Sequence, residues 1–166
     1  MPTAALVIGF VFPAALLWAM ASDLARFEIP NAVPLAIAAA FPAYGLLAGV
    51  GATDLLWHAA TGFGALLVGA ALFFGRAMGG GDAKLIAASA LWIGPADLPR
   101  FLIATALIGG ALALALVLFR LLPEPSWAAE GGWLRRLHAR RREAPYAVAI
   151  GGAGLVWFAG SPLFAA

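Results

Sequence analysis

The chain has 166 residues, of which 64% are hydrophobic and 11% charged, and its mean hydropathy is +0.97. This composition excludes an ordinary soluble domain and indicates a helical integral membrane protein. With no cysteine, the chain cannot contain a disulfide, a thiolate metal site or a cysteine nucleophile. We interpret the pI near 9.7 as a signal of membrane topology, and no nucleic-acid partner is expected.

The apolar runs predict an all-α protein of about six transmembrane helices in a single domain, residues 1–166. The predicted helices are residues 3–21, 31–49, 55–75, 83–93, 101–122 and 146–164. All but the fourth are long enough to cross a hydrocarbon core of ~30 Å at ~1.5 Å per residue. The first run has no basic region before it and no cleavage site after it, so we expect a retained span and not a signal peptide.

Proline and glycine mark the predicted turns. Ile29-Pro30-Asn31 should end the first turn, because proline keeps the preceding residue extended and is tolerated at a helix start. Pro42 predicts a kink in the second helix. Glycines in the third and last helices predict close packing: Gly62, Gly64, Gly69, Gly151, Gly152 and Gly154.

The fourth apolar run, residues 83–93, would be only roughly 16 Å long as a helix. Either it continues, tilted, to about Leu98, or its Asp82 end begins in a water-accessible recess below the membrane surface. The longest polar stretch, about residues 123–145, contains a cluster of five arginines among apolar residues, which predicts a short amphipathic helix on the membrane surface.

The basic residues predict the orientation. Nine of the ten lie in or beside the loops that follow the first, third and fifth helices, and only Arg100 lies on the other side. The positive-inside rule makes the first side cytoplasmic, including the basic loop at about 123–145. Asp23 and Asp82 are then expected at the same, cytoplasmic, face, with both termini opposite.

Three carboxylates remain where helices should meet that face: Asp23, Glu28 and Asp82. Neither histidine, His58 or His138, is near a serine, so a serine hydrolase arrangement is not supported. Two close carboxylates can share one proton, and the ionised member can then activate water while the protonated member polarises a peptide carbonyl. Such a pair has the chemistry of an aspartic peptidase.

The run Gly79-Gly80-Gly81 precedes Asp82. We expect these glycines to let an extended substrate approach the backbone and to permit positive φ in the turn. Other interpretations remain open: Asp82 could cap the helix that starts at Ala83, and the glycines could form a flexible turn. Asp23 could pair with Arg26, and the arginine cluster could contact anionic lipids.

Together these residues resemble the type IV prepilin peptidase family, the membrane aspartic peptidases of the GxGD type. Asp23 six residues before Ile29-Pro30-Asn31 is similar to the family's first aspartate segment. Gly79-x-Gly81-Asp82-x-Lys84-Leu85 resembles the second aspartate motif, and Pro145-Tyr146-Ala147-x-Ala149 resembles the start of the last span, with Ala147 in place of the commoner glycine.

The resemblance implies a cytoplasmic-membrane enzyme of bacteria that cleaves pilin precursors after a short basic leader, just before their apolar helix. We expect no cofactor and assign no metal ligand. Asp23 and Asp82 would be catalytic, and eight residues would bind substrate or support the site: Gly79, Gly80, Gly81, Lys84, Pro30, Asn31, Pro145 and Tyr146. Longer members carry paired cysteines that bind zinc and are linked to methylation. This chain has none, so it resembles the small peptidase-only form that serves Flp-type tight-adherence pili.

Two other classes of function stay open. Membrane acids often mark ion pathways, so a small proton or cation transporter is one alternative, although no inverted repeat is evident. A non-catalytic assembly scaffold in the membrane is another. The sequence leaves the particular pilin, the general base and the oligomeric state undetermined. It also leaves open the role of the arginine-rich loop and whether a metal assists.

Overall fold

The computed structural model describes residues 2–122 and 144–161. Within these residues the chain is helical and contains no strand, which confirms the all-α prediction. The helices are α1 (Thr3–Gly9), α2 (Val11–Arg26), α3 (Ala32–Ala48), α4 (Ala52–Phe74), α5 (Gly80–Leu121) and α7 (Ala147–Gly160). The predicted surface helix falls within residues 123–143, outside the described residues.

Helix lengths and exposed apolar side chains both indicate a membrane protein. The α1–α2 run Thr3–Arg26, α4 and α5 are long and apolar enough to cross a membrane, whereas α3 and α7 are shorter apolar helices. Large apolar side chains cover the outside of the bundle; Phe74, for example, is 82% exposed. Such a surface is stable against lipid and not against water, so the chain is an integral membrane protein.

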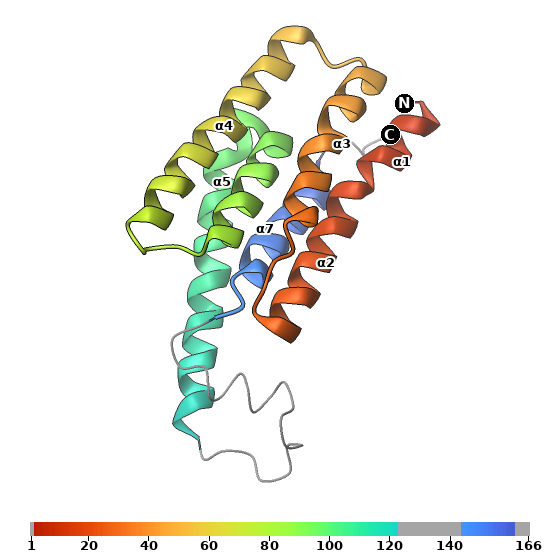
Figure 1. Ribbon diagram of the computed structural model, residues 1–166. Helices are drawn as coiled ribbons and strands as arrows, with labels where there is room; N and C mark the ends of the chain where they lie inside the picture. The colour runs from red at the N-terminus through yellow and green to blue at the C-terminus, as the bar shows by residue number, and fades with distance from the viewer. Residues whose placement is uncertain (1, 123–143, 162–166) are drawn as a thin grey trace.

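The predicted fourth and fifth helices are two limbs of α5, which we call the first limb (80–93) and the second limb (95–121). They meet at Gly94, whose φ of 73° and ψ of 174° are not helical. In Figure 1 the first limb rises beside α4, and the second limb descends past it. The first limb begins at Gly80, three residues earlier than predicted, because the glycine run itself contributes to the first turn.

A cluster of aromatic side chains holds the helices together at the end of the bundle away from the glycine run. The Trp92 ring stacks on Phe12 of α2 with centroids 5.2 Å apart, and it also contacts Phe41 and Tyr44 of α3. Its indole N–H donates a 2.8 Å hydrogen bond to the carbonyl of Ile37. The polar atom of this buried tryptophan is thereby satisfied, and the first limb of α5 is fixed to α2 and α3.

Glycines set two antiparallel helix pairs close together. Between α4 and the first limb, a β-carbon at Gly62 would lie 2.9 Å from Leu91 Cβ, and one at Gly69 would lie 3.0 Å from Ala83 Cβ. Between α7 and α2, Gly151 lies against Met20, and Gly154 lies against Leu16. The prediction of close packing is confirmed at these positions. It is wrong at Gly64, where a β-carbon would meet nothing within 4 Å.

The polar ends of the helices gather as the charge pattern predicts. Figure 1 shows the end of α2, the α4–α5 loop and the start of α7 in the lower half of the bundle, whereas α1 begins and α7 ends in the upper part. The described loops that follow the first and third spans thus lie toward one end of the bundle, and this is where the two aspartates meet.

Candidate active site

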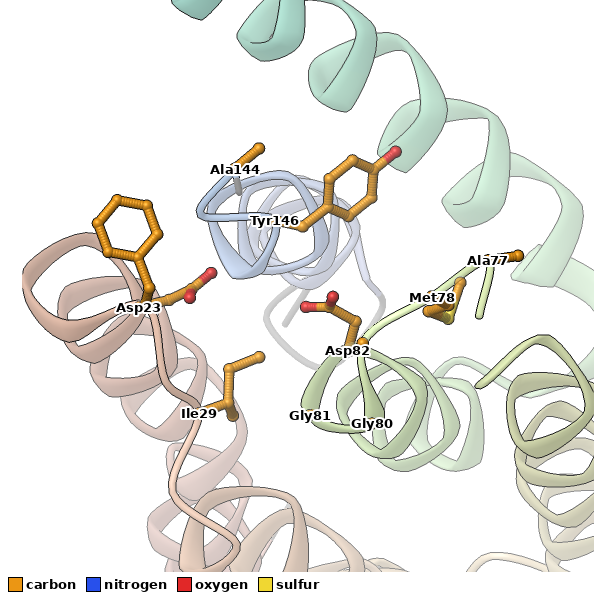
Figure 2. Close-up of a pocket in the computed structure, with 11 residues that line it drawn as sticks. Asp23, Ile29, Ala77, Met78, Gly80, Gly81, Asp82, Ala144 and Tyr146 are labelled. Atoms are coloured by element: carbon orange, nitrogen blue, oxygen red, sulfur yellow. The ribbon is translucent and has the colours of Figure 1, made fainter. Parts of the chain in front are cut away.

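Asp23 and Asp82 line one cavity, although they lie on different helices. Asp23 is in the last turn of α2, and Asp82 is in the first turn of α5. Figure 2 shows their carboxylates pointing toward one another beside the N-terminal end of α7, and the charge of Asp23 acts electrostatically on Asp82. The tertiary fold therefore forms the carboxylate pair that the sequence only placed at a common membrane face.

The cavity has a volume of about 680 Å³ and is partly open. Its walls come from the end of α2, the α4–α5 loop, the start of α5 and the start of α7. The lining residues are Asp23, Phe27, Ile29, Ala77, Met78, Gly79, Gly80, Gly81, Asp82, Ala144 and Tyr146. We call this space the carboxylate cavity; it is large enough for water and a segment of extended peptide.

The start of α7 holds the Asp23 carboxylate. The backbone N–H of Ala147 donates a 2.8 Å hydrogen bond to Asp23 Oδ2, and Asp23 itself is only 6% exposed. The first N–H groups of a helix have no partner within the helix, and the helix dipole favours negative charge there. A carboxylate that accepts from this N–H is therefore held in one orientation, with its second oxygen still available.

The residues after Asp23 end α2 at this point. Phe27 takes a left-handed conformation, φ 58°, and its N–H donates to the carbonyl of Asp23 at 2.8 Å. The Ser22 hydroxyl donates to the carbonyl of Glu28, also at 2.8 Å. These contacts turn the chain so that Ile29 lies against Gly81. The turn thus brings the end of α2 to the start of α5.

Asp82 is not the helix cap that one interpretation of the sequence required. The cap residue is Gly79, and Asp82 follows three positions later. Its carboxylate accepts a hydrogen bond from the Gly79 N–H, as the third helical residue does in a capping box. The contact anchors one side of the carboxylate at the helix start while Asp82 still lines the cavity.

The three glycines act through close packing, and the expected positive φ is wrong. Among the described residues, positive-φ glycines occur only at Gly49 and Gly94. A β-carbon at Gly79 would lie 2.7 Å from Asp82 Oδ2, and one at Gly81 would lie 3.1 Å from Ile29 Cβ. The glycines therefore leave room for the catalytic candidate and for the chain that carries Asp23.

Lys84 and Asn31 lie outside the carboxylate cavity. Lys84 Nζ donates a 2.9 Å hydrogen bond to Asn31 Oδ1, and both residues line a separate hollow among α3, α4 and the first limb. The contact joins the starts of α3 and α5. Their predicted contribution is therefore structural support, and these two side chains do not reach the space between the aspartates.

Pro30, Pro145 and Tyr146, which belong to the predicted motifs, lie where α3 and α7 begin. Pro30 accepts a hydrogen bond from the Val33 N–H at 3.0 Å as α3 begins. Pro145 is fully buried immediately before α7. The Tyr146 ring contacts Gly109 on the second limb and lines the cavity. This segment aligns the N–H of the next residue with Asp23.

Four features of the site were not predicted from the sequence: the backbone N–H of Ala147 as a donor to Asp23, and Phe27, Ile29 and Met78 as lining residues. The sequence does contain a signal for the Ala147 N–H. A helix that starts directly after Pro145 exposes its first N–H groups at the same face at which Asp23 is expected. Nothing in the sequence distinguishes the apolar lining residues from ordinary interior ones. In the part of the chain that the structure describes, no group of three or more potential ligands could hold a metal ion.

Fold and site together define the class: a polytopic helical membrane protein with two carboxylates facing each other in an open cavity near one end. The family model of the type IV leader peptidase family matches residues 10–114. This is more than half of the chain and includes both aspartates. The chain therefore belongs to the type IV leader peptidase family, which indicates a peptidase acting on pilin precursors. Comparisons with curated proteins and with solved structures found no match.

Proposed function

We propose that this protein is an aspartic endopeptidase that removes the leader peptide from Flp-type pilin precursors at the cytoplasmic face of the bacterial inner membrane. The observation that carries the proposal is the pair of carboxylates, Asp23 and Asp82, that face each other across one cavity. Membership in the type IV leader peptidase family supports the reaction and the general substrate.

In the proposed mechanism the pair holds one proton between its two carboxyl groups. The ionised member takes a proton from water, whose oxygen attacks the scissile carbonyl carbon, while the protonated member gives its proton to the carbonyl oxygen. Collapse of the tetrahedral intermediate breaks the C–N bond as a carboxyl group returns a proton to the leaving nitrogen. The hydrogen bonds from Ala147 and Gly79 keep the carboxylates oriented during these transfers.

The cytoplasmic location and the pilin type rest on sequence features. Nine of the ten basic residues fall on the aspartate side of the predicted topology. The chain has no cysteine for a zinc-binding insertion, and this supports the small form of the enzyme, which cleaves without methylating. The substrate would then be a Flp-type precursor whose new amino terminus stays unmodified.

The deciding experiment is mass spectrometry of a Flp-type precursor coexpressed with the intact enzyme, with Asp23→Asn, or with Asp82→Asn. We expect loss of the leader only with the intact enzyme, and a new amino terminus without an added methyl group. Asp54→Asn is the matched control, because Asp54 lies in the first turn of α4, outside the carboxylate cavity, and should leave cleavage unchanged.

Thermal unfolding in detergent should show that all three variants fold. Full cleavage by both Asp23→Asn and Asp82→Asn would refute the assignment of the pair. A precursor left intact by a folded wild-type enzyme would refute the proposed substrate.

A further inference from the structure

A second hollow, which the mechanism above does not use, lies between α4 and the two limbs of α5. Its volume is about 530 Å³, and apolar and small side chains line it. The single hydroxyl among its lining residues, that of Thr61, already donates a 2.7 Å hydrogen bond to the carbonyl of Trp57. We call this hollow the apolar groove. An occupant of the groove needs no polar partner and must itself be apolar.

The apolar groove adjoins the carboxylate cavity at Met78. Met78 lines both spaces, and Figure 2 shows its side chain at the edge of the cavity near Asp82. The next residue, Gly79, donates the hydrogen bond that holds the Asp82 carboxylate. The apolar groove therefore begins beside the space in which an extended segment between the aspartates would lie.

The groove runs from the aspartates into the depth of the membrane. On α4 its lining extends from Leu72 back to Ala60, a distance of about 18 Å at the helical rise. Because Gly69 packs on Ala83 close to Asp82, the Leu72 end is the end nearer the aspartates. This length exceeds half of a hydrocarbon core of ~30 Å.

We propose that the apolar groove receives the apolar helix of the pilin precursor, so that the bond before this helix lies between Asp23 and Asp82. The inference rests on the proposed function. A substrate whose scissile bond immediately precedes an apolar helix requires a carboxylate site with an apolar path leading from it. Gly64 leaves the middle of the groove open, since a β-carbon there would meet nothing within 4 Å, and helices in lipid associate where small residues permit close contact.

The hollow that contains Lys84 does not fit this substrate as well. It lies on the other side of the first limb, shares no lining residue with the carboxylate cavity and contains the Lys84–Asn31 hydrogen bond. A helix seated there would have to cross the first limb to bring its end to Asp82. The apolar groove is the one that shares a lining residue, Met78, with the carboxylate cavity.

The first test fills the groove. Gly64→Trp places an indole in it, and Gly110→Trp is the matched control, because Gly110 also has open space around its α-carbon but lines no described cavity. Each variant is assayed with a full-length Flp-type precursor and with a peptide that contains the leader and the scissile bond but lacks the apolar helix. For Gly64→Trp we expect the KM of the precursor to rise about tenfold, as when burial of one large apolar side chain is lost.

The peptide should be cleaved with unchanged kcat/KM by both tryptophan variants, and Gly110→Trp should cleave the precursor normally. If Gly64→Trp cleaves the precursor as the wild type does, the groove assignment is wrong while the peptidase stands. If the folded wild type cleaves neither substrate, the proposed function is wrong.

The second test measures binding without cleavage. A photoreactive side chain is placed at Val68, in the groove, or at Phe63, in the hollow with Lys84; both side chains are 62% exposed. In the Asp82→Asn background, we expect crosslinks to the precursor from position 68 and not from position 63. Equal crosslinking from both positions, or adducts from position 68 to lipid alone, would overturn the assignment of the groove.

Discussion

The contact between α2 and α7 allows a direct test of how Asp23 is held. A β-carbon at Gly154 would lie 2.6 Å from Leu16 Cδ1, and Leu16 is completely buried. Carbon atoms are in favourable contact at about 3.5 Å or more. Because protein interiors are closely packed and Leu16 is buried, we expect Gly154→Ala to push the two helices apart by about 1 Å.

The same helix supplies the hydrogen bond to the aspartate. The Ala147 N–H is 2.8 Å from Asp23 Oδ2, and a further ~1 Å would take this pair to about 3.8 Å, beyond hydrogen-bond distance. We therefore expect the kcat of Gly154→Ala to fall on the order of 100-fold, as misplacement of about 1 Å can cause. Overpacking should also lower the free energy of unfolding by about 1–3 kcal/mol.

The assay combines precursor cleavage, thermal unfolding in detergent and amide hydrogen exchange over residues 145–149, where exchange should become faster. Gly160→Ala is the matched control on α7, because a β-carbon there would meet nothing within 4 Å. Adding Leu16→Val, which removes the crowded atom, should recover activity in the Gly154→Ala background. Wild-type kcat and unchanged exchange in Gly154→Ala would refute the idea that this helix contact orients Asp23.

Two further substitutions test the start and the reversal of α5. In Gly79→Ala the added carbon would lie 2.7 Å from Asp82 Oδ2. We therefore expect the carboxylate to be displaced and kcat to fall on the order of 100-fold. Cleavage at the wild-type rate would contradict this role of the glycine. Gly94→Ala should lower the free energy of unfolding by at least about 1–3 kcal/mol. The φ/ψ values of Gly94 lie in a region that essentially only glycine adopts, and the added carbon would also lie 2.5 Å from the His58 ring. Thermal unfolding beside Gly110→Ala, which adds a methyl in open space, checks this, and equal melting temperatures would refute it.

Local sequence features predicted much of the architecture. Hydropathy identified the apolar helices, because the length and apolar character of each helix must suit the hydrocarbon core, whatever helices lie beside it. Pro30 and Asn31 correctly marked the start of a new helix. The runs around residues 83–93 and 101–122 were correctly kept apart, although Gly94 and Pro95 connect them within α5.

The errors concern contacts between distant segments. Positive φ was expected at Gly79 to Gly81, and this was wrong. Glycine is needed at these positions because Phe73, Ile29 and the Asp82 carboxylate lie against them and leave no room for a side chain. Lys84 and Asn31 were grouped with the aspartates because they share their motifs. Residue 84 lies two positions beyond residue 82 on a helix, and such residues point in different directions, so Lys84 faces α3 and another hollow.

The sequence alone thus determined a helical membrane protein with two aspartates expected at one face, because hydropathy and charge act on each segment independently. Only the tertiary structure decided that these carboxylates share a cavity and that the Ala147 N–H holds Asp23 across 124 positions. It also placed Met78 between the cavity and an apolar groove. Those features depend on the register of packed helices. Glycine contacts such as Gly154 against Leu16 set that register, and no single segment reveals which residue its neighbour will place opposite.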